Sequence, residues 1–315
     1  MVWQSLPAIR KNAEKGGNEN NMNEEQLLHA ITHYPALYQR KSGNTHKGTF
    51  GTLGIVGSAE GMSGAIVLAG KSALKAGCGK VFLGFAQPQL PVPFIDSAPE
   101  LMLKTALTLM NQQDISAWAI GCGLGLSANS EEILSIALAQ RNENIPYVFD
   151  ADALVLMAKL KSEFSLNQHC VLTPHPKEAS ILLNCTLNDI QNNREEAAKE
   201  IAKLYHCWAI IKGQNTVVTS PKGEITINKT GNSGLSTAGS GDVLTGVMGS
   251  FLAQGMTMSD AVKSAVWIHG MAADMLVEKG IGPIGLTASE LIDTIRNIRN
   301  QIWTLAQQHN ANYFE

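Results

Sequence analysis

Charged residues are scarce in this sequence of 315 residues. Asp, Glu, Lys and Arg make up 16% of it, against about 25% in an average soluble domain. There is no basic excess, because 24 Lys and Arg residues stand against 27 Asp and Glu and give a formal net charge of −3. This balance excludes a protein that binds nucleic acid through bulk positive charge. The low charge density leaves much of the surface neutral or buried, which favours contacts between subunits.

The sequence also lacks paired cysteines. Its five cysteines form no C-x-x-C pair and are Cys78, Cys122, Cys170, Cys185 and Cys207. A zinc site needs ligands paired at short spacing, so the pattern argues against one. Scattered cysteines in odd number are typical of reduced, mostly buried thiols, and they predict a cytoplasmic protein.

No long uncharged apolar run is present. The longest candidate, residues 261–280, contains Lys263, His269 and Asp274, so it predicts a buried or interface helix and not a membrane span. Residues 1–25 are polar and lack the apolar core of a signal peptide. We therefore expect no association with a membrane.

Short apolar runs alternate with stretches of helical periodicity along most of the chain. Strands are expected at 53–57, 81–85, 117–120, 147–149, 170–172 and 208–211, with a hairpin at 216–219 and 225–227. Helices are expected at 65–76, 131–140, 153–160, 177–183, 195–205, 243–254, 260–279 and 288 to about 305. This order predicts an α/β fold in which helices cover both faces of a mostly parallel sheet.

The domain organisation follows from the same pattern. No interior linker divides the alternating region, so we expect a single domain at residues 46–305. Residues 1–45 form an N-terminal extension with a linker-like stretch and are expected to be partly disordered, and residues 306–315 form a C-terminal tail. Functional sites in such folds lie at the carboxyl ends of the strands.

The strongest motif is the glycine-rich run at residues 231–242, directly before the helix expected at 243–254. Small residues such as Gly239, Ser240 and Gly241 let backbone N–H groups approach an anion, and the start of a helix adds further unpaired N–H groups. The run therefore predicts a phosphate loop. Asp242 at its end is either a base that takes a proton from an attacking hydroxyl, or a simple helix cap. The preceding Gly, Ser and Thr residues favour the base.

A second motif covers residues 212–216. Lys212 is followed by Gly213 and, four residues after the lysine, by Thr216, with Gln214 and Asn215 between them. A Lys-Gly turn with a nearby hydroxyl can hold a nucleotide phosphate or ribose, although such turns are also common in hairpins. Its place shortly before the phosphate loop favours nucleotide binding.

A third motif, Thr-Pro-His-Pro at 173–176, follows the strand expected at 170–172. The two prolines stiffen the segment and fix the direction of His175, which favours substrate binding. Glu178 opens the next helix. Its carboxylate either interacts favourably with the helix dipole or belongs to a Mg²⁺ site, and the sequence supports both interpretations equally.

Two further loops follow strands. The run Gly121-Cys-Gly-Leu-Gly125 lacks the full dinucleotide-binding spacing but suits close approach of the backbone to a ligand. Asp150 and Asp152 can bind a magnesium-bridged phosphate or sugar hydroxyls, or cap the next helix. A loosened Walker A pattern at residues 65–72 is rejected, because its apolar spacer places Lys71 in mid-helix.

Taken in order, these motifs resemble a known family. They lie at 47–48, 57–58, 63–65, 121–125, 150–154, 172–176, 212–216 and 231–242. The set resembles the ADP- or ATP-dependent NAD(P)H-hydrate dehydratases, a branch of the ribokinase-like superfamily, over about residues 46–300. The resemblance implies a three-layer α/β/α fold and a lyase that repairs the S form of hydrated NADH or NADPH, by phosphorylating the added hydroxyl and eliminating phosphate.

The resemblance also implies roles for particular residues. Asp242 would be the base, and Ala65, Gly123, His175 and Asp242 would contact the hydrate. Residues 212–216 and Gly241 would contact the adenine nucleotide, ADP or ATP, with Mg²⁺ expected alongside. The family further implies a homo-oligomer, with a tetramer possible, and a dehydratase domain that stands alone or is split from an epimerase.

Two alternatives are weighed against this hypothesis. A ribokinase-like small-molecule kinase, for example for a thiamine-precursor alcohol, would share the loop and the base but release a phosphorylated product. A non-catalytic nucleotide-binding regulator would share the fold. The motifs at 173–176 and 212–216 favour the dehydratase over the kinase, and Asp242 argues against the regulator.

Overall fold

We describe the protein from a computed structural model, which covers residues 21–39, 47–160 and 164–311. The expectation of disorder falls largely on residues 1–20 and 40–46, which lie outside the described part. Residues 312–315 of the expected tail lie outside it as well. Within the described part, no helix is both long and apolar enough to cross a bilayer.

A single nine-stranded sheet forms the centre of the molecule, in the order β3-β2-β1-β4-β5-β6-β7-β8-β9. Its strands are β1 (Thr52–Gly57), β2 (Lys80–Phe85), β3 (Met102–Thr105), β4 (Ala117–Ile120), β5 (Tyr147–Phe149), β6 (Cys170–Leu172), β7 (Trp208–Ile211), β8 (Thr216–Thr219) and β9 (Ile225–Asn228). Pairing is parallel from β3 through β7 and antiparallel for β8 and β9. The mostly parallel sheet is therefore confirmed.

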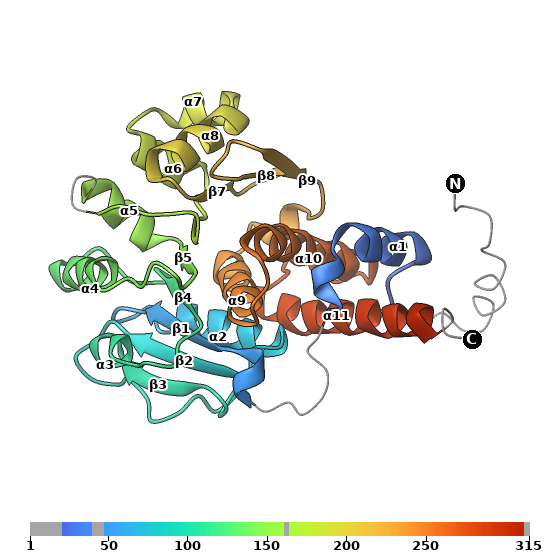
Figure 1. The fold of residues 1–315 in the computed structure, drawn as a ribbon, viewed down its shortest axis with the longest axis horizontal. Coiled ribbons are helices and arrows are strands. Elements are labelled where there is room, and N and C mark those ends of the chain that lie inside the picture. The colour runs from blue at the N-terminus through green and yellow to red at the C-terminus, as the bar shows by residue number, and fades with distance from the viewer. Residues whose placement is uncertain (1–20, 40–46, 161–163, 312–315) are drawn as a thin grey trace.

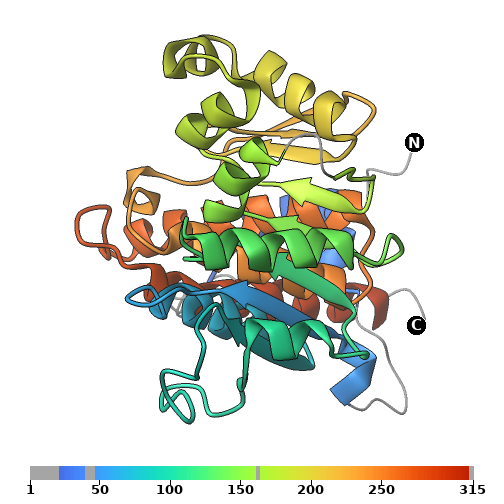
Figure 2. The same ribbon diagram turned by 90° about the vertical axis from the view of Figure 1, so that its left-hand side faces the viewer.

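Helices cover both faces of this sheet and complete three layers (Figures 1 and 2). One face carries α2 (Gly64–Lys75), α9 (Ser240–Ala253), α10 (Met258–Glu278) and α11 (Ala288–Ala311), with α1 (Glu24–His33) packed outside them. The other carries α3 (Ala106–Met110), α4 (Ala128–Ala139), α5 (Asp152–Lys159), α6 (Pro176–Leu183), α7 (Leu187–Asn192) and α8 (Arg194–Tyr205).

Alternation along the strands produces two separate hydrophobic cores. On β4, Ala117 and Ala119 point to the α2/α9/α10 face, whereas Trp118 and Ile120 point to the α3–α8 face. Successive side chains of a strand point to opposite faces, so a strand buried on both sides reads as a continuous apolar run. This is why these strands were readable from the sequence.

Among the α-helices and strands of the described part, four were not predicted from the sequence. Strand β3 covers four residues, helix α3 five and helix α7 six, so none is long enough to show a clear periodicity. Helix α1 lies within the predicted extension, yet its Ala30 is fully buried. Helix α11 also continues to Ala311, beyond the expected end near 305, because no glycine or proline interrupts it.

Candidate active site

The carboxyl ends of the parallel strands bring the predicted motifs to one edge of the sheet. Ser58 follows β1, Gly121 follows β4, Asp150 follows β5, Thr173 follows β6 and Lys212 follows β7. The N-terminus of α9 reaches the same edge, because the Cβ position of Gly241 would lie 3.4 Å from Lys212 Nζ. The rejected Walker A lysine, Lys71, lies within α2 and donates to Ser97 Oγ.

The glycine-rich run forms a loop that ends in the first turn of α9. Gly239 is the N-cap and has φ +88°, a conformation that glycine adopts without strain. Gly241 and Asp242 follow within the first helical turn, where backbone N–H groups have no preceding carbonyl to pair with. The loop therefore has the backbone geometry of an anion-binding site.

Helix α10 holds this loop in place, and the sequence did not reveal this. Asp274 accepts from Gly231 N–H at 2.8 Å and from Asn232 Nδ2 at 3.0 Å. His269 Nε2 lies 2.9 Å from the carbonyl oxygen of Ser240, so it donates to that carbonyl. Burial lowers the pKa of His269 to about 4, so it stays neutral and serves as a structural support. The sequence gave no signal for this role, because the burial of His269 becomes apparent only in the folded structure.

A buried ion pair joins two of the predicted motifs. Lys212 Nζ lies 2.7 Å from Asp150 Oδ1, which also accepts from Thr173 Oγ1 at 2.7 Å. Asp150 Oδ2 accepts from Thr245 Oγ1 at 2.8 Å. Burial by itself would raise the pKa of Asp150, but Lys212 and the two hydroxyl donors outweigh it and lower the pKa. Asp150 therefore stays ionised and fixes Lys212 beside the phosphate loop.

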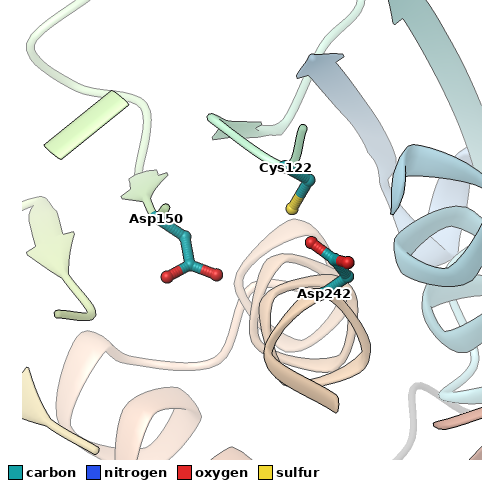
Figure 3. A group of neighbouring side chains, drawn as sticks. All are labelled: Cys122, Asp150 and Asp242. Atoms are coloured by element: carbon teal, nitrogen blue, oxygen red, sulfur yellow. The ribbon is translucent and has the colours of Figure 1, made fainter. Parts of the chain in front are cut away.

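Asp242 lies next to this pair and has a different environment. Burial, followed by the nearby Asp150 carboxylate, raises the pKa of Asp242 to about 6. One carboxylate oxygen of Asp242, one of Asp150 and the Sγ atom of Cys122 all lie within 4.8 Å of one another (Figure 3). A carboxylate whose pKa is just below neutrality is ionised at pH 7 and can still accept a proton, as a general base must.

His175 and Glu178 form a capping box at the start of α6. His175 Nδ1 accepts from Glu178 N–H at 3.2 Å, and Glu178 Oε2 accepts from His175 N–H at 2.8 Å. His175 Nε2 also lies 3.2 Å from Glu178 Oε1. Glu178 thus lies in the first turn of α6 and completes the capping box, while burial raises its pKa to about 7, so its role toward the helix dipole stays a prediction. Its predicted role toward Mg²⁺ stays a prediction, as does substrate binding by the half-exposed His175.

The turn at residues 212–216 connects β7 to β8. Thr216 Oγ1 donates to Gly213 O at 2.8 Å, and Arg194 donates to Gln214 O. Gly213, Gln214 and Asn215 are exposed, whereas Lys212 points inward to Asp150. Lys212 is therefore built into the site, and the three residues that follow it are open to solvent.

The loop after β4 packs against the loop after β1. The Cβ position of Gly123 would lie 3.0 Å from Ala65 Cβ, so these two predicted substrate contacts are neighbours. Asp152 Oδ2 accepts from Gly125 N–H at 2.8 Å and fixes the same loop. Neither Asp150 nor Asp152 caps α5, since its N-cap is Ala151 without a side-chain hydrogen bond. The capping alternative is therefore wrong for both acids, and their binding of phosphate or sugar hydroxyls stays a prediction.

The fold and this edge of the sheet define a class of protein. A three-layer α/β scaffold with a glycine-rich loop at a helix N-terminus and a carboxylate at its end has the features of a ribokinase-like protein. Within that class, the NAD(P)H-hydrate dehydratase family model matches residues 53–297. The chain belongs to this family, which favours the dehydratase over the kinase alternative.

Relatives support the same assignment. The chain is 42% identical over 280 residues to the ADP-dependent (S)-NAD(P)H-hydrate dehydratase of Neisseria meningitidis, covering 88% of this chain and 94% of that protein. It is 32% identical to the bifunctional NAD(P)H-hydrate repair enzyme Nnr of Coxiella burnetii, covering 84% of this chain and 53% of that one. The chain thus spans about half the length of that bifunctional relative.

A solved structure gives the same result. The ADP/ATP-dependent NAD(P)H-hydrate dehydratase of Bacillus subtilis, co-crystallised with ATP and Mg²⁺, superimposes with a TM-score of 0.76 at 28% identity. The match covers 86% of this chain and 96% of that one. The predicted ribokinase-like three-layer fold is confirmed.

Proposed function

We propose that this chain is a hydro-lyase that restores NADH and NADPH from the S forms of their hydrates and consumes ADP or ATP in doing so. The observation that carries the proposal is the placement of Asp242. Its carboxylate, with a pKa near 6, stands in the first turn of α9, directly after the anion-binding loop. Membership of the NAD(P)H-hydrate dehydratase family supports the choice of substrate.

The binding roles follow the arrangement of the loops. The backbone N–H groups of Gly239, Ser240 and Gly241 would face the phosphoryl group that is transferred, with the Lys212 ammonium beside them. Residues 212–216 and Gly241 would hold the adenine nucleotide. Ala65, Gly123 and His175 would contact the hydrate next to Asp242.

The chemistry has two steps. Asp242 takes the proton of the hydrate hydroxyl, whose oxygen attacks the terminal phosphorus, and the nucleotide leaves one phosphate shorter. The carbon–oxygen bond then breaks and phosphate departs with its electron pair. The neighbouring ring carbon loses a proton, and the double bond of the dihydronicotinamide ring forms. The sum is hydrate plus ADP giving NADH, AMP and phosphate, or the same with ATP giving ADP.

Mg²⁺ is expected to enter with the nucleotide phosphates. In the part of the chain that the structure describes, the one acid- or thiol-containing cluster with metal-like spacing is Cys122, Asp150 and Asp242. It does not suit a resident Mg²⁺, because a thiol is a poor ligand for this ion and Asp150 is already paired with Lys212. Glu178 is kept as the candidate Mg²⁺ ligand, although both of its carboxylate oxygens contact His175. No step of the reaction is routed through the ion.

We further propose that the enzyme works in the cytoplasm as a homo-oligomer, with a tetramer as the first candidate. The low content of charged residues, 16%, supports contacts between subunits. Light scattering on a size-exclusion column measures the subunit number directly.

One assay tests the activity. The protein is incubated with NADH hydrate, Mg²⁺ and either ADP or ATP, while dihydronicotinamide absorbance and free phosphate are followed. We expect absorbance to recover together with phosphate release. A phosphorylated product without recovery would identify a kinase, and nucleotide binding without either product would identify a regulator.

A further inference from the structure

The loop after β4 holds the side chain of Cys122 in a fixed direction. The carbonyl of Cys122 accepts from Ser58 N–H at 2.9 Å, and Gly121 N–H donates to Val56 O at 2.9 Å. A Cβ on Gly57 would lie 2.1 Å from the Cys122 carbonyl oxygen, so the two loops are in tight contact. The side chain is fully buried, and its thiol cannot turn to solvent.

The thiol faces the Asp242 carboxylate within the cluster shown in Figure 3. The charged groups around Asp242 are Asp150 after β5, Lys212 after β7 and Asp152 at the start of α5. Burial, then the carboxylates of Asp242 and Asp150, raise the pKa of Cys122 well above its usual value. The sulfur therefore stays protonated, and its S–H can donate to Asp242.

We propose that Cys122 is a positioning residue for Asp242, whose carboxylate it orients toward the substrate through a neutral S–H donor. The proposal rests on the proposed role of Asp242 as the base. A thiol is a weak donor, so it can orient the carboxylate with little loss of basicity. A hydroxyl at the same place would stabilise the ionised carboxylate more strongly and weaken the base, and a methyl group would leave it without a donor.

Three variants test this role. In Cys122→Ala, we expect the acid limb of the kcat/KM profile to move up by about half a pH unit, and kcat at pH 7 to fall about 3- to 10-fold, while the nucleotide KM stays unchanged. In Cys122→Ser, the acid limb should move down. The control is Cys170→Ala, which removes a buried thiol at the start of β6, at the opposite end of the strands, and should leave the profile in place.

A second measurement does not depend on turnover. The titration of the Asp242 carboxyl is followed by carbon NMR and identified by its loss in Asp242→Asn. It should shift in opposite directions in the Ala and Ser variants. Coinciding titrations and acid limbs in wild type and both variants would overturn the role of Cys122. Wild-type protein without activity on the hydrate would instead overturn the proposed function, and the NMR titration would still decide on Cys122.

Discussion

Two acids a few ångströms apart differ in their surroundings and therefore in their chemistry. Asp150 is held ionised by Lys212, Thr173 and Thr245, so it acts as a fixed negative charge. Burial, followed by that negative charge, raises the pKa of Asp242 to about 6, against the lowering effect of the Cys122 thiol. Such a division, with one permanent charge and one group that titrates near neutrality, is typical of catalytic sites.

The first prediction concerns Asp242 in catalysis. Asp242→Asn keeps the size of the side chain but cannot accept the hydroxyl proton. We expect turnover of the hydrate to fall at least about 1,000-fold, which corresponds to about 4 kcal/mol in the barrier. Nucleotide affinity, measured by calorimetry, should stay within a few-fold of wild type. Near-normal turnover in this variant would remove Asp242 from the mechanism.

The second prediction concerns the free energy of unfolding of the same variant. Because folding raises the pKa of Asp242, the folded state binds the proton more tightly than the unfolded chain, and ionised Asp242 costs folding free energy above about pH 6. Below about pH 4 both states are protonated and the cost is absent. Asp242→Asn should therefore be more stable than wild type by about 2 kcal/mol at pH 8, and the gain should shrink toward pH 5.

Urea unfolding at several pH values measures this gain. Asp189→Asn is the matched control, because Asp189 is exposed and hydrogen bonds from Thr186 lower its pKa. It should show no gain at pH 8. An equal response of the two variants to pH would contradict the prediction.

At the scale of elements, the close contact between α2 and α9 positions the phosphate loop. Ser72 Oγ donates to Val243 O at 3.0 Å, and Ser250 Oγ donates to Ala73 O at 2.9 Å. Gly246 lies between these contacts. A Cβ there would be only 2.0 Å from Ala69 O, so the helices can approach this closely only with glycine at this position.

A third prediction follows from this contact. In an open helix, Gly→Ala stabilises by up to about 1 kcal/mol, but Gly246→Ala should destabilise by about 2 kcal/mol or more, since the helices must move apart. Gly64→Ala is the control, because no atom lies within 4 Å of its Cβ position and it should be neutral or stabilising. Thermal unfolding of both variants shows whether each substitution stabilises or destabilises the protein. A stabilised Gly246→Ala would show that the two helices separate at no cost.

At the scale of the molecule, the N-terminal helix is part of the packed structure. Tyr34 stacks on Trp267 of α10 with ring centroids 4.8 Å apart, and Met22 N–H donates to Gln301 of α11 at 2.7 Å. Since α10 also holds the phosphate loop through His269 and Asp274, this segment lies on the far side of the helix that supports the site (Figure 1).

The fourth prediction tests this packing. Ala30→Glu places a carboxylate at a fully buried position and should lower the free energy of unfolding by about 3 kcal/mol. Glu25→Gln, at an exposed position of the same helix, should change it by less than about 0.5 kcal/mol. Denaturant unfolding compares the two. Equal stability of both variants would mean that α1 contributes nothing to the fold.

Much of this architecture was readable from the sequence, because the information is local. Apart from β3, the parallel strands are apolar runs buried on both faces, and the run at 231–242 precedes a helix whose N-terminus needs small residues. The short elements β3, α3 and α7, of four to six residues, gave no such signal. Helix α1 was missed because its buried face becomes apparent only when α10 and α11 are present.

The sequence by itself determined most of the order of strands and helices, the glycine-rich loop that is predicted to bind phosphate, and the acid at its end. Only the tertiary structure decided which side chains meet there. Asp150 pairs with Lys212, 62 residues away, and with Thr245, 95 residues away, and Cys122 faces Asp242 from another loop. Such contacts depend on strand order and helix packing, which bring distant segments together. The local pattern of residues fixes each segment but not its neighbours in space.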